Sequence, residues 1–216
     1  MSEILDITTA VDSDDCYCDG VSVVSLANTL RLGDISGVSY ATGVRWLNLT
    51  IPKGSTITSA YVTFGAAEDQ SGTTVNMSIL AEAADSPITF STFADYVARS
   101  KTSTPIAWNN LSAWVDGNDY QSPDVSALIQ ETIDREGWES GNALVLFFSN
   151  NASSLNARRR AETSGNPTYV ALWPRLHIEY ELPSPSPSPS PSPVNHKRFF
   201  ILYMISQYFQ RRSNQP

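Results

Sequence analysis

Residues 44–66 read VRWLNLTIPKGSTITSAYVTFGA, and their residue types indicate the fold class. Two runs rich in β-branched and aromatic residues, 44–51 and 58–66, are typical of β-strands. Pro52 and Gly54 lie between the runs, and these two residue types interrupt strands and form turns. We therefore predict two successive strands joined by a hairpin or a corner.

Five further segments show similar short runs bounded by Gly, Pro, Asn or Asp. In the last one, Leu176, Ile178 and Tyr180 alternate with polar residues, as in a strand with one buried face. The segments are 15–18, 29–32, 74–83, 142–149 and 175–181. Together they predict an all-β fold, an antiparallel β-sandwich.

One short α-helix is predicted between Ser122 and Gly137. Ser122 is a capping residue type, Pro123 suits the first helical position, and apolar residues recur at helical spacing from Val125 to Ile133. A shorter helical turn is expected near Ser91. The rest of the segment between Pro87 and Pro105 is expected to be a long connection.

The chain divides into three parts of different composition. Residues 1–182 form the predicted sandwich domain, 183–193 are an unbroken Pro-Ser alternation, and 194–216 form a basic, apolar peptide. Proline fixes φ and removes a backbone donor, so the alternation predicts a polyproline II spacer of about 34 Å. The acidic residues all precede the spacer, which gives residues 1–182 a charge of −12 and the remainder +4. So acidic a domain argues against nucleic acid as a partner.

The C-terminal peptide carries a run of large apolar side chains between two basic pairs. The run is shorter than the ~20 residues that a membrane-spanning helix needs, so we do not expect it to cross a membrane. It is predicted to anchor the chain to neighbouring copies or to other proteins of an assembly, as an added strand or an inserted segment. A helix lying on anionic lipid and a peptide without function are the alternatives. The candidate anchoring residues are Phe199, Phe200, Ile201, Leu202, Tyr203, Ile205, Tyr208 and Phe209.

Four stretches, 46–62, 122–131, 137–144 and 174–180, together resemble a jelly-roll module. Such modules occur in bacteriophage virion proteins, such as decoration and fibre proteins, and in bacterial surface proteins, where they are similar to carbohydrate-binding modules. The resemblance covers about residues 11–182. It implies a jelly-roll β-sandwich and transfers no catalytic residue.

A non-enzymatic role follows from the residues as well. His177 is the only histidine before the spacer, and we expect it on a strand surface beside Glu179. Neither a Gly-x-Ser-x-Gly nor a His-Glu-x-x-His motif is present. The close pair Cys16 and Cys18 suits reduced thiols better than a disulfide. The spacing does not complete a zinc site either.

We therefore predict a virion structural protein of a bacteriophage, one that also adheres to glycans. The alternative is a glycan-binding adhesion module of a cell-surface or secreted protein. Residues 1–10 lack the basic start and apolar core of a secretory signal, which favours the virion as the location.

Two groups of residues are candidate binding sites. Trp108, Trp114 and Tyr120 lie in a loop-rich stretch and could stack on sugar rings, or instead close the hydrophobic core. Asp12, Asp14, Asp15 and Asp19 could hold calcium, the only cofactor that the sequence suggests, or form a solvated acidic loop. The run Arg158–Arg160 is expected on a solvated loop crest, with an acidic partner as the alternative.

Overall fold

The computed structural model describes residues 2–25 and 27–184, and these residues fold as an antiparallel β-sandwich. The strands are β1 (Ser2–Thr8), β2 (Asp15–Cys18), β3 (Val23–Val24), β4 (Thr29–Ile35), β5 (Val38–Leu49), β6 (Thr56–Gly65), β7 (Met77–Ala81), β8 (Ile106–Trp108), β9 (Asp119–Gln121), β10 (Asn142–Asn150), β11 (Arg158–Glu162) and β12 (Arg175–Glu181). The helices are α1 (Phe93–Ala98) and α2 (Ser126–Ile133), with 3-10 turns η1 (Asp12–Asp14) and η2 (Pro167–Leu172).

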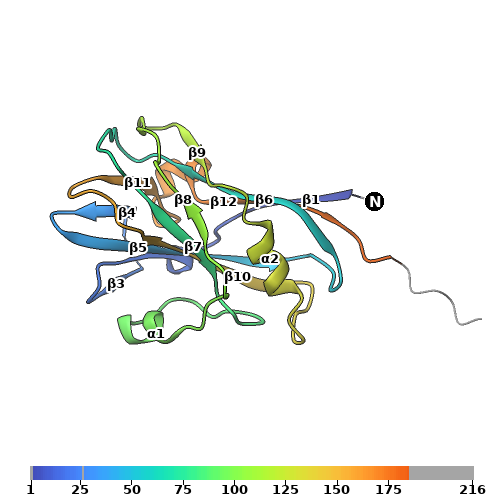
Figure 1. Cartoon of the computed structure of the whole chain (residues 1–216). Coiled ribbons are helices and arrows are strands. Elements are labelled where there is room, and N and C mark those ends of the chain that lie inside the picture. The colour runs from blue at the N-terminus through green and yellow to red at the C-terminus, as the bar shows by residue number, and fades with distance from the viewer. Residues whose placement is uncertain (1, 26, 185–216) are drawn as a thin grey trace, which may run out of the picture. The chain divides into compact units, whose positions relative to one another are not determined.

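The strand order is that of a jelly roll. The smaller sheet has the order β1-β12-β6-β9, and the larger sheet contains β5-β10-β7-β8, extended by β4 and β11. The chain passes between the sheets after β1, β5, β6, β8, β9 and β11, as in a double Greek key. The predicted all-β sandwich is confirmed. The connection at Pro52 and Gly54 proves to be a corner, because β5 and β6 belong to different sheets (Figure 1).

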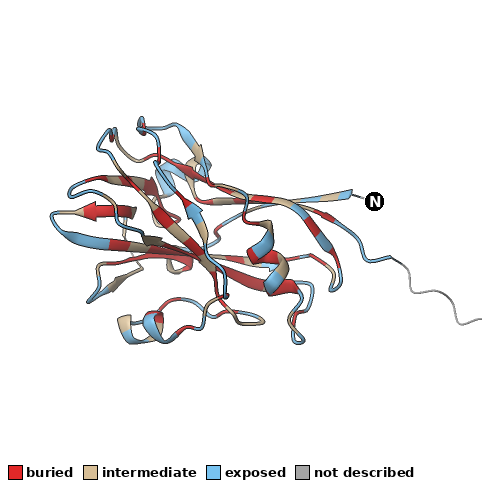
Figure 2. Cartoon of the chain, in the orientation of Figure 1, coloured by how far each residue is buried: buried red, intermediate tan, exposed pale blue. Residues whose placement is uncertain are grey.

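The core lies between the inner faces of the two sheets. Trp46 of β5 is fully buried, and its indole N–H donates to the carbonyl oxygen of Pro174 at 3.2 Å. Phe64 of β6 meets Phe148 of β10 edge to face, with ring centroids 5.0 Å apart. In the smaller sheet, buried residues alternate with half-buried ones along β12, and half-buried residues alternate with exposed ones along β1 (Figure 2). This alternation confirms the predicted buried face of β12.

The predicted helix is present but begins later than expected. Ser122 continues the pairing with β6, since its backbone N–H donates to the carbonyl oxygen of Val62 and its Oγ accepts from the Val62 N–H. The helix α2 therefore starts at Ser126, beside β6 and β7 (Figure 1). Its predicted apolar face, from Val125 to Ile133, is buried in the core.

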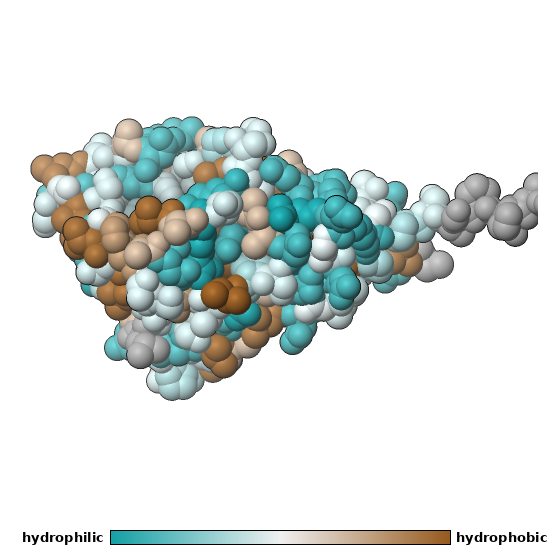
Figure 3. All heavy atoms as spheres, turned by 90° about the horizontal axis from the view of Figure 1, so that it is seen from below, coloured by the Kyte–Doolittle hydropathy of each residue, from teal (hydrophilic) through white to brown (hydrophobic). Residues whose placement is uncertain are grey.

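A second, smaller apolar cluster covers the outer face of the larger sheet. Phe90 and Tyr96, from the segment around α1, pack on Phe147 of β10 and on the two cysteines of β2. Helix α1 is the turn expected near Ser91, and Thr92 caps it through the Asp95 N–H. Seen from the side of α1, the surface shows separate hydrophobic patches among polar residues (Figure 3).

Five strands, β1, β3, β8, β9 and β11, were not predicted. They are short or carry charged residues, as in the Arg158–Glu162 run of β11. The compact unit containing the sandwich extends to Pro183. Among the residues that the structure describes, no helix is long and apolar enough to cross a membrane.

Candidate functional site

The three aromatic residues singled out in the sequence line one pocket of about 360 Å³. Strand β8 ends at Trp108 on the edge of the larger sheet, and β9 carries Tyr120 on the edge of the smaller sheet. The connection between these strands supplies Trp114. The sandwich topology thus brings residues from two sheets to one opening. The remaining lining residues are Leu111, Ser112, Asp119 and Gln121.

The three rings differ in how much surface they offer. Trp108 and Trp114 are only 8% and 2% exposed and belong to the core. Trp114 lies parallel to Tyr120, with ring centroids 4.9 Å apart. It also stacks on Phe64, with ring centroids 6.4 Å apart. Both indoles therefore close the core, as the alternative interpretation stated, while the half-buried Tyr120 presents ring surface to the pocket.

Tyr120 is held in place by its hydroxyl oxygen, which accepts from the backbone N–H of Val115 at 2.8 Å. Asp119 and Gln121, its neighbours on β9, are exposed at the rim. An ion pair of 2.5 Å joins the Asp119 carboxylate to Arg175 of β12. The pocket thus combines an aromatic wall with polar rim groups, which suits a ligand that has both apolar and hydroxyl-bearing surfaces.

Arg159 supports this pocket from beneath, which corrects its prediction as part of a solvated crest. It lies on β11 opposite the buried Leu32 and is itself fully buried. Its guanidinium donates to the carbonyl oxygens of Ser112 at 2.6 Å, Leu111 at 2.7 Å and Gly72 at 2.9 Å. Burial lowers the pKa of Arg159. The side chain thereby fixes the backbone that forms the pocket wall.

No local signal could have revealed this role, because the three arginines are identical in sequence and the alternation appears only in their burial. Arg158 and Arg160 are half-buried and share the strand parity opposite to Arg159 and Ala161, which are buried. Arg160 pairs with Glu68, with 3.0 Å between Nε and Oε1. An alternating pattern of this kind is typical of a strand, even when its inward residue is an arginine.

Three of the four aspartates of the N-terminal segment have separate partners, and Oδ1 of the fourth, Asp12, is buried without a hydrogen-bond partner among the residues described. Asp14 forms an ion pair with Arg45 at 2.8 Å, and the Asp15 carboxylate accepts from the N–H and the hydroxyl of Ser164 at 2.8 and 2.7 Å. Asp19 accepts from the N–H of Ser22 at 2.8 Å. Each of these carboxylates stabilises a different piece of backbone or a different side chain. Across residues 2–25 and 27–184, no group of three or more His, Cys, Asp or Glu side chains is placed to hold a metal ion.

Asp15 is chemically the most unusual of the four. It is 1% exposed, and burial raises its pKa from 3.8 to about 7, despite the opposing hydrogen bonds from Ser164. The charges of Asp12 and Asp14 raise the pKa further. Asp15 therefore exchanges a proton near neutral pH while it joins η1 and β2 to the loop after β11.

The two cysteines and His177 of the domain pack within the fold or pair with neighbouring side chains. Cys16 and Cys18 are free and buried, and burial raises the pKa of the Cys16 thiol. His177 lies on the outer face of β12, where Nδ1 is 2.6 Å from Asp6 and Nε2 is 3.4 Å from Glu179. Its ring stacks on Tyr61 at 4.7 Å. The predicted neighbour Glu179 is confirmed, and Asp6 and Tyr61 are additional contacts.

The candidate anchor, residues 199–209, lies outside the described residues. The Pro-Ser spacer lies outside them as well, except for Pro183 and Ser184.

No known family model matches this chain, and no curated protein matches it in sequence.

Proposed function

We propose that this chain is a non-enzymatic binding module, and that the pocket of Trp108, Trp114 and Tyr120 binds a sugar ring of a glycan. The convergence of these three residues at one opening of about 360 Å³ carries the proposal. The Tyr120 ring supplies a wall against which the apolar C–H face of a pyranose packs. Asp119, Gln121 and Ser112 supply hydrogen-bonding groups for its hydroxyls.

Preorganisation supports this proposal. Trp114 and the Val115 N–H hold Tyr120, and Arg159 holds the carbonyls of residues 111 and 112. A ligand therefore meets a wall that is already ordered, so less conformational entropy is lost on binding. The chemistry at the pocket is also that of binding, because its carboxylate, Asp119, is engaged with Arg175.

The binding test uses a glycan array followed by titration of the best glycan. We expect Tyr120→Ala to weaken binding by at least about tenfold, since it removes the exposed ring. Tyr61→Ala is the matched control, because Tyr61 is a half-buried tyrosine on the outer face of the same sheet and stacks on His177. Unchanged binding by Tyr120→Ala, or equal loss in both variants, would contradict the assignment.

We further propose that the module belongs to a bacteriophage virion, as a capsid decoration, head-fibre or tail-associated protein. The jelly-roll topology agrees with the resemblance drawn from the sequence, and the Pro-Ser run followed by a basic, apolar peptide suits a domain projecting from an assembly. The alternative is an adhesion module on a cell surface. Mass spectrometry of purified particles and of cell envelopes distinguishes the two, because only the correct location contains the protein at stoichiometric amounts.

The C-terminal peptide has its own test within this proposal. We expect a chain truncated after Pro183 to remain folded, soluble and monomeric and to lose its place in the assembly. The core residues of the described sandwich all precede Pro183, so the truncation removes none of them. If the truncated chain joins particles at full occupancy, the contact resides on the sandwich instead.

A further inference from the structure

A second pocket lies beside the aromatic one, and it is polar. Its volume is about 210 Å³. It opens between the segment that follows β6 and the turn that precedes β11. The lining residues are Asp69, Gln70, Ser71, Gly72, Asn156 and Arg158.

The two pockets flank one ordered ridge. Gln70 and Trp114 exchange two backbone hydrogen bonds of 2.8 Å, which pairs the wall of the polar pocket with the wall of the aromatic pocket. The N–H of Asp116 donates to the Asp69 carboxylate at 2.9 Å. Beneath the ridge, Arg159 binds carbonyl oxygens from both segments. Paired backbones of this kind are about 5 Å apart. The walls of the two pockets are therefore one backbone pairing apart.

The polar pocket contains hydrogen-bonding atoms that the protein leaves free. In the described part of the chain, Oε1 of Gln70 and Nε of Arg158 are buried and have no hydrogen-bond partner. A buried polar atom without a partner is destabilising, so a side-chain adjustment that lets Gln70 or Arg158 bind a ligand hydroxyl is favourable. Asn156 is fixed in orientation, because its side-chain oxygen accepts from the Ser36 N–H at 2.7 Å.

The charges in the polar pocket indicate what kind of group it takes. Asp69 contributes a negative charge and Arg158 a positive one, so the lining is close to neutral. Gln70 and Asn156 add both donors and acceptors. A neutral lining with donors and acceptors in mixed positions suits adjacent hydroxyl groups better than a phosphate or a carboxylate.

We infer that the polar pocket is a second sugar subsite, and that the ligand is an uncharged oligosaccharide of at least two units. One ring packs against Tyr120 in the aromatic pocket, and the hydroxyls of a following unit pair with Gln70 and Arg158 across the ridge. This inference rests on the proposed glycan binding and specifies the ligand class. It predicts an affinity that rises with chain length.

The test is calorimetric titration of the full chain with glucose, galactose and mannose and with their linear di-, tri- and tetrasaccharides. We expect the best oligosaccharide to bind roughly tenfold or more tightly than its monosaccharide, since hydrogen bonds to a charged partner such as Arg158 are stronger than those between neutral groups. Arg158→Gln is expected to remove this gain and to leave monosaccharide binding unchanged. The control is Arg160→Gln on the same strand, because Arg160 pairs with Glu68 and does not line the pocket.

The possible results separate the two proposals. Equal affinity for the monosaccharide and its oligosaccharides, or a length gain that Arg158→Gln retains, would overturn the second subsite while leaving glycan binding intact. Loss of the gain in both arginine variants would also overturn it, since the effect would then not come from the pocket. If no sugar of the panel binds and the glycan array is also empty, the proposed function itself fails.

Discussion

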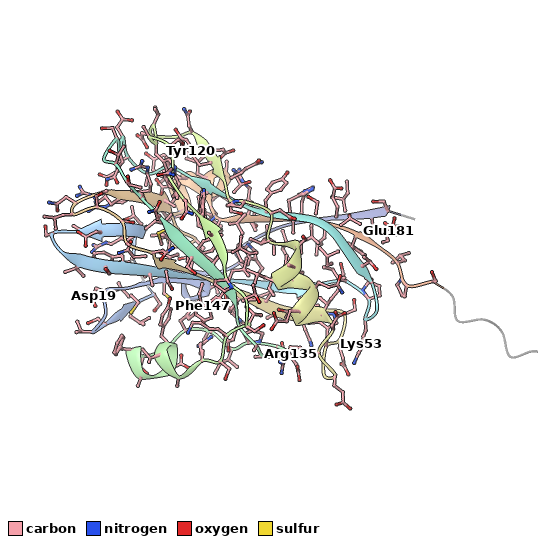
Figure 4. The ribbon with its side chains drawn as sticks, viewed as in Figure 1. Asp19, Lys53, Tyr120, Arg135, Phe147 and Glu181 are labelled. Atoms are coloured by element: carbon pink, nitrogen blue, oxygen red, sulfur yellow. The ribbon has the colours of Figure 1, made fainter. Side chains whose placement is uncertain are left out.

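The side chains of the aromatic segment 108–120 and of the acidic segment 12–19 find their contacts in different ways. In the first, side chains from separate strands meet at one opening, because β8 and β9 are edge strands of the two facing sheets. In the second, carboxylates adjacent in sequence turn to separate partners, such as Arg45 for Asp14 and Ser164 for Asp15. Figure 4 shows Tyr120 at the β9 edge and Asp19 well away from it, by β2 and β3.

Clustering along the sequence is therefore a weaker sign of a site than convergence of strand edges. Carboxylates repel one another, so neighbours in a loop gain more from separate donors than from one another. Aromatic side chains gain from mutual contact, and the stacked pair of Trp114 and Tyr120 is an example. The first region thus has an ordered and partly exposed aromatic surface, and the second joins parts of the fold.

The largest effect on the free energy of unfolding is expected from a substitution in the aromatic segment. Trp114→Ala removes a ring that is 2% exposed and that contacts Phe64 and Tyr120. We expect it to lower the free energy of unfolding by about 4 kcal/mol, through lost burial and the cavity that remains. Urea denaturation measures this change. A loss below about 1 kcal/mol would mean that the pocket wall is not part of the core.

Arg159 and Arg160 give a matched pair for the same region. Arg159→Met keeps the aliphatic stem but leaves the carbonyls of residues 72, 111 and 112 without their donor. We expect a loss of about 3 kcal/mol, because several buried acceptors lose their partner together. Arg160→Met removes a partly exposed ion pair with Glu68 and is expected to cost less than about 1 kcal/mol. Similar costs in both variants would contradict the structural role of Arg159.

Much of the sandwich could be predicted from the sequence, because its long strands carry a clear alternation or apolar run. β12 was predicted with its observed bounds, 175–181. The missed strands are the ones whose pattern is masked by charge or brevity. β11 reads as a basic run, and β8 and β9 have three residues each. Their place is decided by tertiary pairing, which no local signal records.

The candidate sites were predictable to different degrees. The sequence indicated the aromatic residues but not which ring stays accessible, since that depends on how Trp114 packs between Phe64 and Tyr120. It gave no sign that Arg158 and Gln70 line a second pocket, because these residues are brought together only by the pairing around the ridge. Contacts between distant segments set both outcomes.

In the acidic region, the effect to test is the pH dependence of stability. The pKa of Asp15 is raised by burial to about 7 in the folded state, from 3.8. The folded state therefore retains a proton that the unfolded state releases, and stability falls as pH rises from 4 to 7. At about 1.4 kcal/mol per pKa unit, we expect this group to cost about 3 kcal/mol over that range.

Asp15→Asn isolates this contribution, because asparagine does not ionise and can still accept from Ser164. We expect the variant to match the wild type near pH 4 and to be the more stable protein at pH 7 and above. Asp19→Asn, in the neighbouring turn, removes one formal charge as well and serves as the control. Denaturation curves measured across pH would refute the proposed cause if Asp15→Asn and the wild type remained parallel.

The smallest expected effect concerns calcium at the acidic region. A calcium site needs about six to eight oxygen ligands directed at one point, whereas Asp14, Asp15 and Asp19 each direct a carboxylate oxygen to a separate protein donor. Recruiting them to one ion would break the Asp14–Arg45 ion pair and the Asp15–Ser164 hydrogen bonds, whose loss opposes the energy of ion binding. We therefore expect millimolar Ca²⁺ to leave the thermal midpoint of the protein unchanged, in contrast to a glycan bound at the aromatic region. A midpoint that rises with Ca²⁺ and no longer rises in Asp19→Asn would restore the calcium site, because binding to the folded state alone raises stability by mass action.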